Sequence, residues 1–177
     1  EFVVSPAKST AKGSFAGYAG QTHSQIQTLN EINVEDLPRF SSGLKELDRV
    51  LGGGIVPGSA ILIGGSPGAG KSTLLLQVMC QQASSKSALY VTGEESLQQV
   101  AMRARRLGLP DDKLMMLAET NVEMICDLAL KQKPQIMVID SIQVMHVSDV
   151  QSAPGSVSQV RESAAYLTRF AKQHHIA

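Results

Sequence analysis

The most restrictive stretch of this chain is "ILIGGSPGAGKST", residues 61–73. The aliphatic residues at 60–63 predict a short buried strand, and the residues after the lysine predict a helix. Between them lies Gly-x-x-x-x-Gly-Lys-Ser, the P-loop pattern, in the strand–loop–helix context that this pattern requires. Its glycines let backbone N–H groups turn inward around an anion, and the start of the helix adds a partial positive charge. The sequence therefore predicts a nucleotide-phosphate site.

The residues of this loop have distinct expected roles. Lys71 would reach the β- and γ-phosphates, and Ser72 would supply an oxygen ligand to Mg²⁺, a hard cation that prefers oxygen. A glycine-rich turn without a ligand is the alternative interpretation, and the flanking strand and helix count against it. The residues expected to bind the nucleotide are Gly65, Ser66, Pro67, Gly68, Ala69, Gly70, Lys71, Ser72 and Thr73.

Further carboxylates complete the predicted site. Asp140 ends the apolar run "QIMVID", where a P-loop protein places a Mg²⁺-binding acid; capping of the next segment is the alternative. Glu94 follows the run "ALYVTG", at the sheet edge where open α/β folds bind ligands. We expect Glu94 to orient water, with Glu95 as the second candidate, although both could instead stabilise a helix N-terminus. Lys71 and Glu94 are thus the expected catalytic residues.

Strands and helices alternate along the rest of the chain. Apolar strands separated by amphipathic helices predict an α/β fold with a mostly parallel sheet and helices on both faces. Strands are expected at 88–93, 113–117 and 135–140, and helices around 74–79, 95–108, 122–131 and 156–173. A short helix is expected after Ser41 or Ser42, either of which could cap it, with Leu44, Leu47, Val50 and Leu51 on one face.

The two ends of the chain differ from its middle. Residues 1–36 are rich in Ser, Ala, Gly, Thr and Gln, which is the composition of a flexible linker. The ordered domain is therefore expected at 37–177. Its last residues, "HHIA", resemble the start of another strand, so the domain is expected to be truncated at its C-terminal end.

Composition excludes several classes of function. The formal net charge is zero, so charge gives no indication of a nucleic-acid partner. Cys80 and Cys126 lie in separate apolar segments, which predicts buried free thiols rather than a disulfide or zinc site. No apolar run is long enough for a membrane span, and we expect a cytoplasmic protein. Aromatic residues make up only 4%, which predicts an aliphatic core.

Four stretches carry a resemblance to a known family. They are "RFSSGLKELDRVLGGGIVPGSAILIGGSPGAGKSTLLLQ", "LYVTGEESLQQVAMRARRLGL", "IMVIDSIQVMH" and "GSVSQVRESAAYLTRFAK". In this order and spacing they resemble the bacterial RadA (Sms) family of DNA repair proteins, from about residue 37 onward. The resemblance implies a RecA-like P-loop ATPase core that forms homo-hexameric rings on single-stranded and branched DNA. It also implies ATP- and Mg²⁺-dependent branch migration beside a recombinase filament.

Residue roles follow from the resemblance by position. The residues of the P-loop, Glu94 and Asp140 keep the roles given above. The loop at 147–159 occupies the place where RecA-like proteins present a DNA-contacting loop, and its hydroxyls and amides could contact phosphates through neutral hydrogen bonds. The candidate DNA contacts are Ser148, Gln151, Ser156, Ser158 and Gln159. Arg103, Arg105 and Arg106 are interpreted instead as a solvated helix face.

The chain departs from the family at both ends. The family's N-terminal zinc finger needs paired C-x-x-C motifs, which this chain lacks, so zinc is expected only in that finger. The family's later sensor strand, its Lys-Asn-Arg-Phe-Gly motif and its protease-like domain are also missing. We therefore expect an internal piece of such a protein. Two alternatives remain: a nucleotide-binding interaction module without turnover, and a clock-type RecA-like ATPase that phosphorylates its own hydroxyls.

Overall fold

The computed structural model describes residues 28–31, 38–110 and 112–177. The predicted linker, 1–36, lies outside these ranges except for residues 28–31, which include the 3-10 helix η1 (Leu29–Glu31). The remaining elements, in chain order, are α1 (Lys45–Val50), α2 (Lys71–Ala83), β1 (Ala88–Thr92), α3 (Leu97–Arg106), β2 (Met115–Ala118), α4 (Val122–Gln132), β3 (Ile136–Asp140), η2 (Ile142–Val144) and α5 (Val157–His174).

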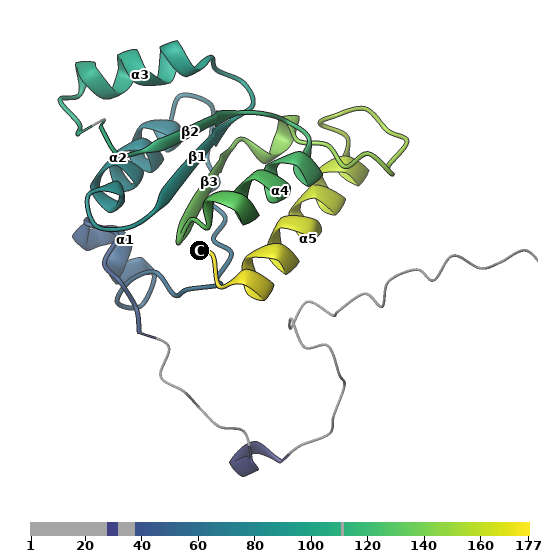
Figure 1. Cartoon of the computed structure of the whole chain (residues 1–177), viewed down its shortest axis with the longest axis horizontal. Helices are drawn as coiled ribbons and strands as arrows, with labels where there is room; N and C mark the ends of the chain where they lie inside the picture. Colours follow the sequence, from purple (N-terminus) through teal and green to yellow (C-terminus); the bar gives the residue numbers. More distant parts are fainter. Residues whose placement is uncertain (1–27, 32–37, 111) are drawn as a thin grey trace, which may run out of the picture.

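The strands form one parallel sheet in the order β2-β1-β3, with β1 in the middle. Figure 1 shows α2 and α3 on one side of this sheet and α4 and α5 on the other. Parallel strands need crossover connections, and the helices that make these crossovers cover both faces. The predicted α/β fold, a parallel sheet between two layers of helices, is confirmed. Among the described residues, no helix is both long enough and apolar enough to cross a bilayer.

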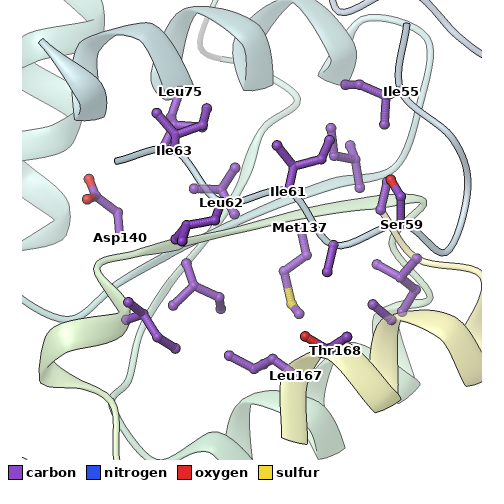
Figure 2. A pocket seen from close by; sticks show the side chains of 18 of the residues that line it. Ile55, Ser59, Ile61, Leu62, Ile63, Leu75, Met137, Asp140, Leu167 and Thr168 are labelled. Atoms are coloured by element: carbon purple, nitrogen blue, oxygen red, sulfur yellow. The ribbon is translucent and has the colours of Figure 1, made fainter. Parts of the chain in front are cut away.

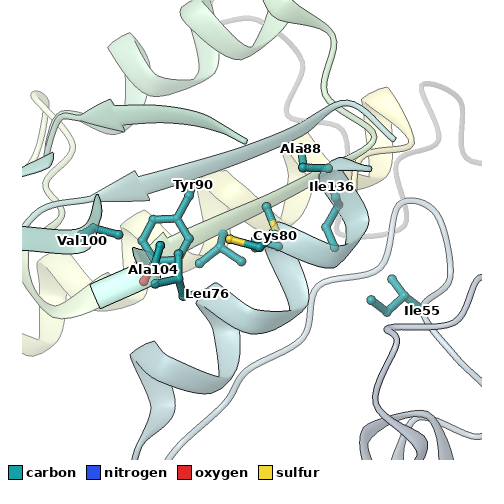
Figure 3. Close-up of a cluster of buried hydrophobic side chains, with 11 residues drawn as sticks. Ile55, Leu76, Cys80, Ala88, Tyr90, Val100, Ala104 and Ile136 are labelled. Carbon is teal, nitrogen blue, oxygen red and sulfur yellow. The ribbon is translucent and has the colours of Figure 1, made fainter. Parts of the chain in front are cut away.

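Alternation along β1 divides the core into two clusters. Ala88 and Tyr90 pack with α2 and α3, whereas Leu89 and Val91 pack with α4 and α5 (Figure 3 shows the first cluster). The strands are in register, so that Tyr90 lies opposite Val138 and Thr92 opposite Asp140. Since side chains alternate with a period of two, Asp140 points to the same face as Val138, the face covered by α2. The sheet therefore directs Asp140 toward the helix that follows the P-loop.

The strand expected at 60–63 is not formed. Ile61 is 43% exposed and Leu62 is 86% exposed, and no described strand pairs with this segment. The outer edge of β3 pairs instead with Ala177: the Met137 N–H donates to the Ala177 carbonyl (2.8 Å), and the Ala177 N–H donates to the Gln135 carbonyl (3.1 Å). An extended segment becomes a strand only when a neighbour satisfies its backbone groups, so apolar sequence alone predicted this strand wrongly.

A pocket of about 480 Å³ separates the 60–63 segment from β3. Figure 2 shows Ile61 and Ile63 on one side of it, and Met137 and Leu167 on the other. Its lining is mostly aliphatic, and Lys71 and Asp140 also line it. The pocket therefore extends to two residues of the predicted nucleotide site.

The first helix also differs from its prediction. Its N-cap is Leu44, and no side chain caps it. The hydroxyl of Ser41 donates to Asp48 (2.5 Å), and the backbone N–H of Ser42 donates to the same carboxylate (2.7 Å). Val50, expected on the inner face, is 71% exposed. Asp48 thus holds the serine segment from within α1, and the hydroxyls of Ser41 and Ser42 bond to the backbone of Gly43 and Leu44 instead of capping the helix.

Candidate nucleotide-binding site

The P-loop is an open turn that leads directly into α2. Gly68 and Gly70 have φ angles of +78° and +86°, a conformation that side-chain-bearing residues rarely adopt. Gly70 is the N-cap of α2, and Lys71, Ser72 and Thr73 form its first turn. No side chain caps this fully described helix, so its first N–H groups are available to a ligand. Exposed backbone and an uncapped helix N-terminus form a suitable site for phosphate.

Lys71 closes over the loop that precedes it. Its ammonium group donates to the carbonyls of Gly65 (2.9 Å) and Ser66 (3.0 Å). The positive charge is thereby held against the carbonyls of the glycine-rich turn, and Lys71 would have to leave these carbonyls to contact a bound anion.

Asp140 is held at the carboxyl end of β3. The hydroxyl of Tyr90 donates to Asp140 Oδ2 (2.5 Å), and the Gly93 N–H donates to the Asp140 carbonyl (3.0 Å). Burial, followed by the hydrogen bond to Asp140, raises the pKa of Tyr90 well above its ordinary value. The phenol thus stays a neutral donor, and the carboxylate of Asp140 has a defined partner.

Glu94 and Glu95 have contrasting surroundings. Glu94 is exposed and accepts a hydrogen bond from the hydroxyl of Ser141, the residue after Asp140. Glu95 is partly buried and forms an ion pair with Arg103, whose side chain is only 17% exposed. Because Glu95 already has Arg103 as its partner, its carboxylate is less available to bind a water molecule than that of Glu94. The surroundings therefore favour Glu94 over Glu95 as the residue that orients water.

The ion pair also corrects the interpretation of the basic helix. Arg103 was expected on a solvated face, but it forms an ion pair with Glu95, and α3 packs together with α2 against one face of the sheet. The positions of Tyr90 and Ser141 were not anticipated either. A phenol in a strand whose residues are all buried signals a polar partner, because a hydroxyl is costly to bury alone. That signal for Tyr90 was present in the sequence.

The loop at 147–159 is held from within the domain. Gln159 is only 2% exposed, and its amide bonds to the backbone of Val147, Val150 and Ser152. In this structure the polar atoms of Gln159 bind the loop itself and are not presented at the surface, where a DNA contact would need them. The hydroxyl of Ser156 caps α5 by accepting from the Gln159 N–H.

The other candidate DNA contacts differ in their availability. The Ser148 hydroxyl accepts from Asn121 (2.9 Å), and the Ser148 N–H donates to Glu123 (2.9 Å). Gln151 and Ser158 are exposed. The structure thus presents Ser148, Gln151 and Ser158 at the surface, although Ser148 already bonds to Asn121 and Glu123, and the hydroxyl of Ser156 caps α5.

The donor set can be compared with the needs of a nucleotide and its metal. Among the described residues, no group of three or more His, Cys, Asp or Glu side chains could hold a metal ion. Mg²⁺ seldom uses such a cage: it takes one or two protein oxygens together with water and phosphate. The hydroxyl of Ser72, in the first turn of α2, and the carboxylate of Asp140, on the α2 side of the sheet, are oxygen donors of this kind. The residues therefore fit a nucleotide with Mg²⁺.

Comparison with known proteins gives a consistent result. Residues 40–119 match a protein-family model described as "ATPase: KaiC". The chain is 70% identical over 172 residues to DNA repair protein RadA of Haemophilus influenzae, an alignment that covers 96% of the chain and 38% of that relative. It is 68% identical to RadA of Escherichia coli (92% and 35% covered) and 46% identical to RadA of Bacillus subtilis (97% and 38%). The chain thus spans little more than a third of the length of these curated relatives.

Proposed function

We propose that this chain, which belongs to the RadA family of DNA repair proteins and has a RecA-like α/β fold, binds and hydrolyses Mg-ATP in response to single-stranded DNA. In the whole protein, this turnover would drive branch migration of recombination intermediates. The observation that carries the proposal is the P-loop, where positive-φ glycines lead into an uncapped helix N-terminus.

Phosphate binding rests on the P-loop and its lysine. Residues 65–73 would surround the phosphates with backbone N–H groups, and the N-terminus of α2 would favour their negative charge. Lys71 would exchange its bonds to Gly65 and Ser66 for contacts with the β- and γ-phosphates. Ser72 and Asp140 would hold Mg²⁺, which neutralises charge that develops on the transferred phosphoryl group.

Water activation is assigned to Glu94. Its carboxylate is exposed and is oriented by the Ser141 hydroxyl, which leaves its other oxygen to bind the attacking water. The carboxylate would orient this water toward the γ-phosphate and accept its proton. Glu95 is not given this role, because Arg103 neutralises it.

DNA contact is assigned to the loop between η2 and α5. Gln151 and Ser158 are exposed there, and neutral side chains of this kind bind phosphate oxygens without reading sequence. Because the loop follows β3 closely, a change at Asp140 would reach it over a short stretch of chain. In the whole protein we assign branched DNA and a recombinase filament as partners, a homo-hexameric ring as the assembly, and the cytoplasm as its location.

The test is ATP turnover by the purified chain, measured with and without single-stranded DNA. We expect Lys71→Ala to abolish nucleotide binding, and Glu94→Gln to bind nucleotide but hydrolyse it far more slowly. Glu95→Gln is the matched control, since it makes the same chemical change one residue away. Unchanged nucleotide affinity in Lys71→Ala would refute the P-loop assignment. Slow turnover in Glu95→Gln, with normal turnover in Glu94→Gln, would reverse the roles of the two carboxylates.

A second candidate function follows from the family model matched by residues 40–119. An ATPase of the clock type would transfer the γ-phosphoryl group to its own hydroxyls. Incubation with γ-labelled ATP separates the two functions: labelled inorganic phosphate supports hydrolysis, whereas label retained on the protein supports self-phosphorylation. Nucleotide binding that yields neither product would identify an interaction module without turnover.

A further inference from the structure

Among the described residues, Tyr90 is the only aromatic one that is buried in the cluster between the sheet and α2 and α3, and Phe40 packs against this cluster from outside. It is fully buried, and Figure 3 shows its ring between Val100 and Ala104 of α3 and Leu76 of α2. A phenylalanine side chain would keep the ring and satisfy the same packing contacts. The hydroxyl therefore needs an explanation other than packing, because a buried hydroxyl is tolerated only with a partner.

The register of the sheet explains how that hydroxyl reaches the predicted metal site. Tyr90 lies opposite Val138, and Asp140 is two residues further along β3 on the same face. The long phenol spans this diagonal and donates to Asp140 Oδ2 at 2.5 Å. No other hydrogen bond to the Asp140 carboxylate is found among the described residues, so its Oδ1 atom is left for another donor or a cation.

The neighbouring charges leave this hydrogen bond undisturbed. Glu95 and Arg103 lie near the phenol, but they neutralise one another as an ion pair. Asp140 is therefore the acceptor for Tyr90, and Tyr90 is the donor for Asp140. A carboxylate at the end of a strand would otherwise rotate freely about its side-chain bonds, and one fixed oxygen removes that freedom.

We propose that Tyr90 is a positioning residue for Mg²⁺ binding, which holds Asp140 by Oδ2 so that Oδ1 faces the phosphate site. The proposal rests on the proposed function, in which Asp140 is the magnesium-side acid. Partners of this kind orient metal ligands, and their removal weakens metal binding about 10- to 100-fold in known sites. Tyr90→Phe removes only the hydroxyl, and it keeps the ring that packs against both helices.

The experiment measures binding of a fluorescent ATP analogue as Mg²⁺ is increased, and again in EDTA. The variants are Tyr90→Phe, Asp140→Asn, the double variant and Tyr166→Phe, a matched control in the other core cluster. We expect Tyr90→Phe to raise the Mg²⁺ concentration for half-maximal binding about tenfold, with binding in EDTA unchanged. In the Asp140→Asn background, Tyr90→Phe should cause no further shift in the Mg²⁺ dependence, because the effects of substitutions at two interacting residues are not additive.

The outcomes separate the two proposals. If Asp140→Asn shifts the Mg²⁺ dependence and Tyr90→Phe does not, the role of Tyr90 is refuted and the proposed function stands. If Asp140→Asn causes no shift either, the metal assignment in the proposed function is wrong. An equal effect of Tyr90→Phe with and without Asp140→Asn, or a tenfold shift in Tyr166→Phe, would also overturn the proposal.

A second measurement does not depend on the folding of a variant. The chain has three tyrosines, four phenylalanines and no tryptophan, so at the long-wavelength end of the near ultraviolet, beyond the phenylalanine band, tyrosine is the only aromatic side chain that absorbs. Adding Mg²⁺ with the analogue should produce a tyrosine difference band in the unaltered chain, because a cation at Asp140 weakens the hydrogen bond from Tyr90. The absence of this band while Mg²⁺-dependent binding occurs would contradict the proposal.

Discussion

Replacing Gln159 should destabilise the domain although the residue lies outside the nucleotide site. Its amide accepts from the Val147 N–H (2.9 Å) and donates to the carbonyls of Val147 (3.3 Å), Val150 (2.9 Å) and Ser152 (3.0 Å). The side chain is 2% exposed, so little water is available to replace these bonds. Gln159→Leu retains a similar volume but removes every polar atom of the side chain.

The magnitude follows from the number of bonds that the amide can make. Its two N–H groups are shared among three carbonyls, so the side chain contributes two donors and one acceptor. At about 1 kcal/mol for each bond, Gln159→Leu should cost about 3 kcal/mol of unfolding free energy. For a domain of this size, that corresponds to a fall in Tm of about 10 °C.

The assay is urea and thermal unfolding followed by circular dichroism. Gln151→Leu is the matched control, because Gln151 is an exposed glutamine on the same loop, and its replacement should change stability by no more than about 0.5 kcal/mol. If the two variants have the same stability within that margin, the amide of Gln159 does not hold the loop. The reasoning would then fail even though the distances are short.

Three further predictions concern other parts of the fold. Ser96→Ala removes the capping box that Ser96 forms with Gln99 at the start of α3, and should cost about 1 kcal/mol in urea unfolding. Burial, with the nearby acidic side chains, raises the pKa of Cys126 to about 12, so its alkylation at pH 8.5 should be slow until the chain unfolds. The Cys126 thiol loses its proton at a lower pH in the unfolded chain than in the folded chain. The free energy of unfolding should therefore fall as pH rises above about 9, and it should fall less in Cys126→Ala. Gly93→Ala would place a methyl group 2.5 Å from Val144 Cγ2 and should lower the free energy of unfolding by about 1–3 kcal/mol, which thermal unfolding measures. If the variant is as stable as the unaltered chain, η2 can move away from the added methyl group at no cost.

The P-loop and the alternation of strands and helices could be predicted because they depend on local chain properties. Gly68 and Gly70 adopt backbone angles that glycine permits, and α2 begins at Lys71, within the motif. The position of Asp140 also follows from sequence, since a buried parallel strand is a continuous apolar run that ends at its first charged residue. Each of these inferences needs only residues close together in the chain.

The remaining features depend on residues that the fold brings together from distant positions. The choice between Glu94 and Glu95 depends on Arg103 and Ser141, and no local pattern distinguishes two adjacent glutamates. Likewise, the sequence around Gln159 predicts an exposed residue, whereas the folded loop covers its side chain. Such contacts depend on where whole elements lie relative to one another.

The sequence by itself determined that this chain has a phosphate-binding loop, an acid at the end of a buried strand and helices on both faces of a parallel sheet. Only the tertiary structure decided that the 60–63 segment remains unpaired and that Tyr90 donates to Asp140. The physical reason is the range of the interactions. Backbone angles and apolar periodicity act over a few residues, whereas strand pairing and buried hydrogen bonds join groups about 50 residues apart, and only the folded chain selects their partners.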